Sequence, residues 1–236
     1  MKLHAHLIAL AIGLGSTASA APRYPHPPSA HASDPAIARA EALWIAADKT
    51  RDPLRATRAW QTAAAAFDAI AADTHADLAV RTEAAYTTVL AWKNAIDRDP
   101  RVVEPGARGD GGARPFDANT ASFVAAITRF VVLAPTAPDA VGLRFLRGNL
   151  HRRFGHDALA EADFVAILDD DRGAEVAEYA ANLLLDLLNR EQRYDDLIRW
   201  VHVLRADAPF MKAHPDLSDT LARIDQQWQR HQAAPH

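Results

Sequence analysis

The sequence predicts an all-α fold in which antiparallel helix pairs stack as a helical solenoid, closed by a C-terminal capping helix. Alanine, the strongest helix former, accounts for 52 of the 236 residues, whereas glycine accounts for 10. Large apolar residues recur at spacings of three and four along most of the chain, which is the period of an amphipathic helix. A repeat of 37 residues indicates that helix pairs follow one another as similar units. No run of alternating, β-branched residues indicates a strand.

Residues 1–20 have the layout of a secretory signal peptide. Lys2 supplies a positive charge, residues 7–14 form a short apolar core, and small residues end it at 18–20. Eight apolar residues cannot span a hydrocarbon layer that needs about 20, so we expect cleavage after Ala20 rather than a membrane anchor. The chain contains no cysteine, which excludes lipid attachment at an N-terminal cysteine. We therefore expect a periplasmic or secreted protein without membrane insertion.

The next regions are a linker and a first group of helices. Residues 21–35 contain five prolines, which fix φ and remove amide donors, so this segment is expected to be an extended linker. Residues 36–97 are expected to form N-terminal helices, and Pro53 is well placed to open one of them. The helices expected in this region cover residues 36–49, 53–72 and 77–96.

Residues 98–118 differ from the rest of the chain. They contain four of the ten glycines, three prolines and four arginines, which predicts a long loop. The tripeptide Arg108-Gly109-Asp110 and the glycines beside it follow no strand and open no helix, so they predict neither an adhesion motif nor a phosphate-binding loop. Beyond this loop, helices are expected over residues 118–133, 138–154, 157–169, 174–190, 195–206 and from Pro215 onward.

The repeat is seen in three sets of apolar residues, of the kind usually found in protein cores. Members of each set lie 37 positions apart, and a period in the thirties with two helices per unit is typical of helical solenoids. The sets are Phe123, Ala160 and Leu197; Ile127, Phe164 and Val201; and Phe130, Ile167 and Leu204, with a diverged copy at Ala63, Phe67 and Ile70. Residues 119–210 are therefore expected to be tandem repeats. Residues 211–236 follow as the capping helix and tail, with Leu217, Leu221, Ile224 and Trp228 on one face of the helix.

Gly148, Gly155, Ala160 and Phe164 resemble the signature of a tetratricopeptide repeat. They place a small residue in the first helix, a glycine in the turn, and a small residue followed by an aromatic in the second helix. The chain is similar to the repeat domains of bacterial outer-membrane assembly lipoproteins and of Tol–Pal-associated coordinator proteins. This resemblance implies a right-handed solenoid and a protein-binding role. The chain departs from the family pattern at Arg144, Arg147 and Arg172.

Composition and motifs argue against most catalytic classes. The net charge is −4 and the 22 arginines are spread along the chain, which disfavours a nucleic-acid surface. No metalloprotease, nucleophile-elbow or phosphate-loop motif is present, so no enzyme activity, cofactor or metal is expected. The acidic run at 169–171 lacks the spacing of a calcium loop. An alternative stays open, namely a helical enzyme or accessory domain with a site near His151, His156 and Glu161.

The resemblance also implies where a partner binds, because the first helix of each pair lines the concave groove in that family. The residues placed there are Asn149, Arg152 and Arg153 from one unit, and Tyr179, Asn182, Asp186, Asn189 and Arg190 from the next. Asparagine offers a donor and an acceptor, and arginine offers a fork that suits carboxylates. Asp186 subtracts charge and stands four residues before Arg190, with which it can pair. We expect a non-catalytic envelope scaffold that binds a protein or peptide. Two other interpretations of these residues stay open, a contact with peptidoglycan and a solvated surface without a partner. The oligomeric state also stays open.

Overall fold

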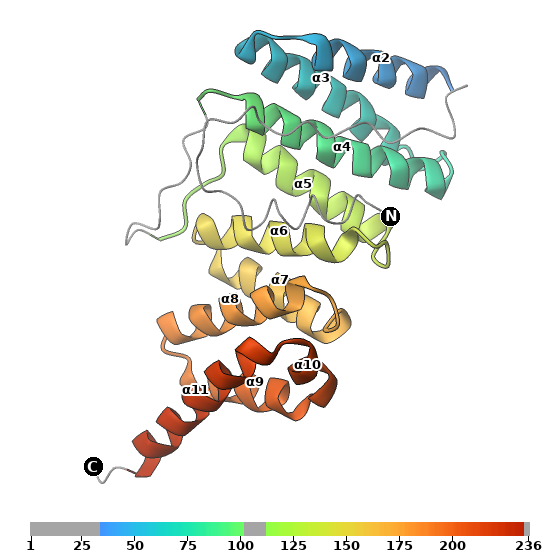
Figure 1. Ribbon diagram of the computed structural model, residues 1–236. Coiled ribbons are helices and arrows are strands. Elements are labelled where there is room, and N and C mark those ends of the chain that lie inside the picture. Colours follow the sequence, from blue (N-terminus) through green and yellow to red (C-terminus); the bar gives the residue numbers. More distant parts are fainter. Residues whose placement is uncertain (1–33, 102–111, 234–236) are drawn as a thin grey trace. The chain divides into compact units, whose positions relative to one another are not determined.

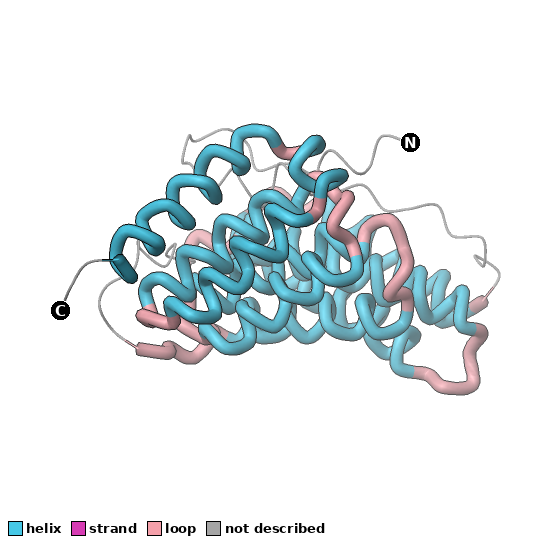
Figure 2. Tube along the Cα trace, turned by 90° about the horizontal axis from the view of Figure 1, so that it is seen from below, coloured by secondary structure: helices cyan, strands magenta, loops and turns pink. Residues whose placement is uncertain are grey.

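The computed structural model describes residues 34–101 and 112–233, and this part of the chain is helical with no strand (Figures 1 and 2). The helices are α2 (Pro35–Lys49), α3 (Pro53–Ala72), α4 (Leu78–Arg98), α5 (Ala118–Leu133), α6 (Ala140–Arg153), α7 (Asp157–Asp170), α8 (Val176–Arg190), α9 (Tyr194–Ala206), α10 (Ala208–Ala213) and α11 (Pro215–Ala233). The all-α prediction is confirmed. The predicted signal peptide, nearly all of the linker and the tripeptide at 108–110 lie outside the described residues.

Aspartates fix where four of the helices begin. Asp34, Asp52, Asp117 and Asp207 each accept a hydrogen bond from a backbone amide in the first turn, at 2.7–3.0 Å. These amides have no partner within their own helix, so the carboxylate satisfies a donor that would otherwise be lost. Proline follows directly in two cases, as at Pro53, where its missing amide costs nothing.

The described chain divides into two compact units, one ending at His156 and one beginning at Asp157. The N-terminal unit contains α2 to α6, and Figure 1 shows these helices side by side in chain order. Its core contains an aromatic group in which the rings of Trp44 and Trp60 meet edge to face, with centroids 4.7 Å apart. Phe67 packs edge-on against Trp44 at 6.3 Å. Small buried alanines fill much of the remaining interior of α3 and α4.

The C-terminal unit contains α7 to α11. Consecutive helices α7, α8 and α9 pack against one another, and α11 packs against α9. Leu184, Leu187 and Leu188 of α8 are fully buried. On α11, Leu217 and Leu221 are buried while polar side chains cover the opposite face. This polar backing is what a helix at the end of a stack requires.

The 37-residue register coincides with burial. All nine residues of the three sets are buried, and so are the three residues of the diverged copy on α3. The ends of α5 and α7, at Leu133 and Asp170, are 37 residues apart, as are the starts of α7 and α9, at Asp157 and Tyr194. Helices therefore pack in neighbouring pairs within each unit, and the repeat places equivalent residues in the core. The region predicted to hold the repeats, 119–210, extends over parts of both units.

One helix was not predicted. Between the helix expected to end at residue 206 and the one expected from Pro215, the chain forms the short helix α10, with Pro209 in its first turn. The Asp207 side chain caps that turn through the amide of Phe210, whose own side chain is buried. Proline is acceptable both at the start of a helix and beyond its end, so Pro209 alone does not distinguish a helix start from a helix stop.

None of the helices in the described ranges combines the length and the apolar character needed to cross a membrane.

Candidate functional site

Five of the eight residues predicted to bind a partner form one exposed stripe on α8. Tyr179, Asn182, Asp186, Asn189 and Arg190 are all exposed, and their spacing places them along one side of the helix. The opposite side of α8 is its buried leucine face. We call these five residues the α8 stripe. Because the leucine face of α8 is buried, the backbone of α8 is held in place, and the side chains of the α8 stripe project from a fixed support.

Contacts within the C-terminal unit engage part of this stripe. The Nη2 atom of Arg190 lies 2.9 Å from Oδ2 of Asp157, the first residue of α7. Sequence spacing had suggested Asp186 as a partner for Arg190; the pair with Asp157 crosses from one helix to the next. The Asn182 side-chain amide donates to the Glu178 carbonyl at 3.1 Å. The stripe therefore keeps its asparagine oxygens and the Tyr179 ring at the surface, with less positive charge than predicted.

The other three predicted residues lie at the end of α6, in the N-terminal unit. Asn149, Arg152 and Arg153 are half-buried rather than exposed. The Arg153 carbonyl accepts a hydrogen bond from Arg114 Nη2 at 3.3 Å, and the Phe154 carbonyl accepts one from the Arg114 backbone amide at 2.8 Å. Residues near the end of the predicted loop therefore pack on the end of α6. The structure brings together the five residues of the α8 stripe and, separately, the three residues of α6.

The end of α6 also holds a cluster of aromatic and imidazole rings. Phe116 contacts His151, Phe154 and His156, with ring centroids 5.5, 4.7 and 4.7 Å away, and the two histidine rings are 5.7 Å apart. Gly155 has a φ of +77°, and a Cβ there would lie 3.2 Å from the Cα of Ala113. The turn thus needs glycine for both its backbone conformation and the close approach of the loop.

Glu161, the third residue of the alternative site, is engaged within the C-terminal unit. Both of its carboxylate oxygens accept hydrogen bonds from Arg193, at 2.6 and 3.0 Å. These bonds, together with those to Asp196, raise the pKa of Arg193. Among the described side chains, no group of three or more His, Cys, Asp or Glu is arranged to hold a metal ion.

A polar network lies where the predicted loop begins and ends. Arg101 donates two side-chain hydrogen bonds to Asp99, each at 2.8 Å, and these bonds lower the pKa of that carboxyl. Asp99 also accepts from Asn119 at 3.1 Å, and Asn119 accepts from Gln61 of α3 at 2.6 Å. The network therefore joins the end of α4 to the start of α5. Residues 102–111, between these ends, lie outside the described residues.

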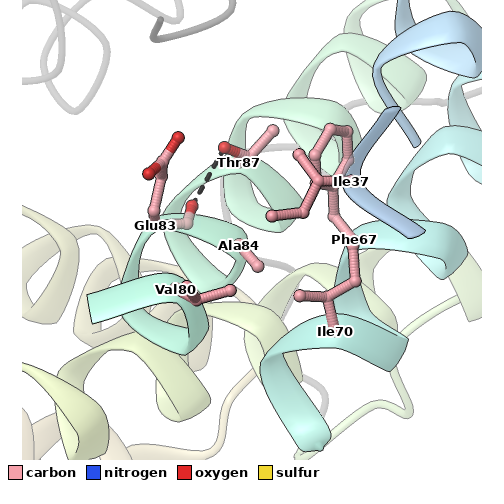
Figure 3. Close-up of a pocket in the computed structure, with 7 residues that line it drawn as sticks. All are labelled: Ile37, Phe67, Ile70, Val80, Glu83, Ala84 and Thr87. Carbon is pink, nitrogen blue, oxygen red and sulfur yellow. Dashed lines mark hydrogen bonds between the residues drawn. The ribbon is translucent and has the colours of Figure 1, made fainter. Parts of the chain in front are cut away.

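Two hollows in the N-terminal unit differ sharply in size. The first, between α2, α3 and α4, holds about 10 Å³ and is lined by apolar side chains such as Ile37 and Phe67 (Figure 3). Within it the Thr87 hydroxyl donates to the Glu83 carbonyl at 2.9 Å. That volume holds at most about one water molecule, so it is a packing defect rather than a ligand site.

The second hollow is an open groove of about 350 Å³ beside α5 and the start of α4. Its lining residues are Arg81, Ala125, Thr128, Arg129, Val132 and Leu133, which we call the α4–α5 groove. Sequence reasoning did not find it. The sequence offers one sign of this groove, the apolar residue Val132 on the polar side of α5. No local spacing relates Val132 to Arg81 on α4.

In comparisons with known proteins, no family model, curated protein or solved structure matches this chain.

Proposed function

We propose that the protein is a non-catalytic interaction scaffold of the bacterial cell envelope, exported to the periplasm, that binds a peptide segment of a partner protein. The proposal takes the helix pairs to be a right-handed, tetratricopeptide-like solenoid. The residues of the proposed groove are the α8 stripe in the C-terminal unit and, separately, Asn149, Arg152 and Arg153 in the N-terminal unit. The observation that carries it is the α8 stripe, in which five predicted residues are all exposed on a helix buried from behind.

The chemistry of these residues suits an extended peptide. Asparagine side chains at 182 and 189, two helical turns apart, offer paired donors and acceptors to a peptide backbone. Tyr179 adds a rigid amphipathic ring, a residue type enriched where proteins bind one another. Arg152 and Arg153 add positive charge that favours an acidic segment or a chain terminus.

The alternative, a helical enzyme with a site near His151, His156 and Glu161, is less consistent with the contacts. Arg193 engages Glu161 through both oxygens, and Phe116 packs on both imidazoles. A zinc-dependent enzyme of this kind would gain thermal stability when zinc is added, whereas the scaffold would not.

The decisive experiment is a double charge reversal. A partner is first captured from the native periplasm and identified by mass spectrometry, and its affinity for the purified protein is then measured. The variant Arg152→Glu with Arg153→Glu should bind at least roughly tenfold more weakly, about 1.4 kcal/mol, with helicity intact by circular dichroism. Raised salt should weaken binding by the wild type, since exposed charges are screened over about 8–10 Å.

The matched control reverses two arginines on α3, Arg55→Glu with Arg58→Glu, which are exposed and lie outside the proposed groove. This variant should retain the wild-type affinity. Partner affinity that is equal in both double variants would place the binding surface elsewhere.

Export is tested separately. The native protein should begin at Ala21-Pro22-Arg23 when sequenced from its N-terminus, because the short apolar core and the small residues before Ala21 suit a signal peptidase. An envelope-associated protein that retains Met1 would contradict the proposed localisation.

A further inference from the structure

The α4–α5 groove is a shallow depression on the surface of the N-terminal unit. Its space of about 350 Å³ is largely open to solvent, so a segment bound there would lie along the surface. The groove belongs entirely to the N-terminal unit, and none of its residues was assigned to the proposed partner site. It is thus a second surface, distinct from the α8 stripe.

The charged groups of the groove are cationic. Arg81 and Arg129 line it, and no acidic residue does. Arg129 is held by Asp68 of α3, with Nε and Oδ1 2.9 Å apart, so its charge is largely balanced. For Arg81, in contrast, the described residues provide no acidic partner; its Nε donates to the Ala71 carbonyl at 3.3 Å. The groove therefore has one cation whose charge is compensated and one whose charge is not.

The rest of the groove combines apolar surface with a hydroxyl group. Val132 is 72% exposed and offers apolar surface within the groove. Ala125 stands two turns before it on the same side of α5 and is also exposed. Between them, the Thr128 hydroxyl accepts a hydrogen bond from Arg147 Nη1 of α6 at 3.0 Å.

We propose that the α4–α5 groove binds an acidic segment of a partner protein, with a carboxylate at Arg81 and a neighbouring aliphatic side chain against Ala125 and Val132. Charge complementarity selects the carboxylate, because a guanidinium pairs with it through two parallel hydrogen bonds. The exposed valine selects the aliphatic neighbour, since covering it removes apolar surface from water. The inference rests on the proposed scaffold function and adds to it a second binding surface within the N-terminal unit.

The test uses a library of random heptapeptides displayed on phage and selected against the full chain. Enriched sequences are expected to place Asp or Glu next to Leu, Ile or Val. The strongest of them is synthesised with a fluorescent label, and its affinity is measured by anisotropy. Arg81→Met, which keeps the alkyl stem and removes the charge, should weaken binding at least roughly tenfold.

A second variant guards against loss of folding. Val132→Glu changes a side chain that is already in water, so the fold is retained, while the new carboxylate repels the acidic peptide and competes for Arg81. This variant should also bind at least roughly tenfold more weakly. The matched control is Arg55→Met on α3, an exposed arginine outside the groove, which should bind as the wild type does.

Three results would overturn the inference: no enriched sequence, enriched sequences without an acid, or an affinity that neither Arg81→Met nor Val132→Glu changes. The same peptide measured on the Arg152→Glu, Arg153→Glu variant separates the two proposals. Sensitivity to that variant alone would support the proposed groove and reject this one. Sensitivity to Arg81→Met and Val132→Glu alone would support this groove by itself.

Discussion

The two units of the molecule use different chemistry to hold similar helices together. In the N-terminal unit, buried alanines let helices approach, and an edge-to-face pair of Trp44 and Trp60 fills the space between α2 and α3. In the C-terminal unit, leucines fill the core. Ion pairs join helices in both units: in the N-terminal one Arg129 of α5 binds Asp68 of α3, and in the C-terminal one several such pairs are seen. Arg193 of the turn before α9 binds Glu161 of α7, Arg172 binds Asp207, and Arg205 of α9 binds Asp225 of α11.

This difference teaches that the 37-residue register fixes which residues are buried but not how neighbouring helices recognise one another. Apolar packing depends on shape, so we expect the N-terminal unit to respond to changes of side-chain volume. Partly exposed ion pairs contribute little energy each and are screened by salt, so we expect the C-terminal unit to respond also to pH and ionic strength.

The largest effect is expected from Phe164→Ala in the C-terminal unit. Phe164 is fully buried and occupies the middle of the repeat register, so its removal loses apolar burial and leaves a cavity. The free energy of unfolding should fall by roughly 3–5 kcal/mol, as measured by urea denaturation followed by circular dichroism. Destabilisation should reach neighbouring helices, because stacked units are stabilised through their interfaces.

Leu159→Ala on the same helix is the matched control, since Leu159 is 55% exposed. It should change stability by less than about 0.5 kcal/mol. Equal losses in the two variants would show that burial does not follow the register.

A smaller effect, in the other unit, is expected from Ala64→Leu on α3. Ala64 is fully buried in the aromatic and alanine core, so three added carbon atoms must displace neighbouring helices. Overpacking of this kind costs about 1–3 kcal/mol, which urea denaturation would detect. Ala65→Leu, one residue further and exposed, is the control and should leave stability nearly unchanged. If Ala64→Leu were stabilising, the N-terminal core would be loosely packed and the contrast between the units would fail.

Local and periodic features of this fold were accessible from the sequence. Pro53 predicted the start of α3, because the preference for proline in the first turn is decided locally. Phe123, Ile127 and Phe130 were placed in the core by their spacing and by their copies 37 and 74 residues later. Such information resides in neighbouring residues or in repetition, so one chain is enough to find it.

Features that depend on contacts between distant parts of the chain could not be predicted from the sequence. The pair of Arg190 with Asp157 joins residues on two helices, 33 positions apart, and no local spacing relates them. The packing of Phe116 on the end of α6 depends on where a glycine-rich loop returns to the helices. The α4–α5 groove joins Arg81 to Val132 across 51 positions. The three predicted residues of α6 were expected to be exposed and are half-buried, because segment 112–117 lies on that helix end.

The smallest effect is a pH dependence located in the C-terminal unit. Asp225 of α11 lies close to two basic groups of α9, with its Oδ1 3.2 Å from His202 Nε2 and its Oδ2 bonded to Arg205. The hydrogen bond to His202 and then the charge of Arg205 hold the pKa of the Asp225 carboxyl below its ordinary value. Its contribution to stability is therefore complete above the unfolded-state pKa of about 3.9, and it is lost as pH falls through the lower pKa of the folded state.

The Asp225→Asn variant isolates this contribution. Its melting temperature should be slightly lower than that of the wild type at neutral pH. The two should converge as the pH falls from about 4 through the lower folded-state pKa of Asp225, below which both side chains are uncharged. Asp219→Asn, on the exposed face of the same helix, is the control and should follow the wild-type profile. A constant difference between Asp225→Asn and the wild type at every pH would mean that the carboxyl acts through its shape and hydrogen bonds alone. The ion pair between α9 and α11 would then contribute no charge-dependent stability to the C-terminal unit.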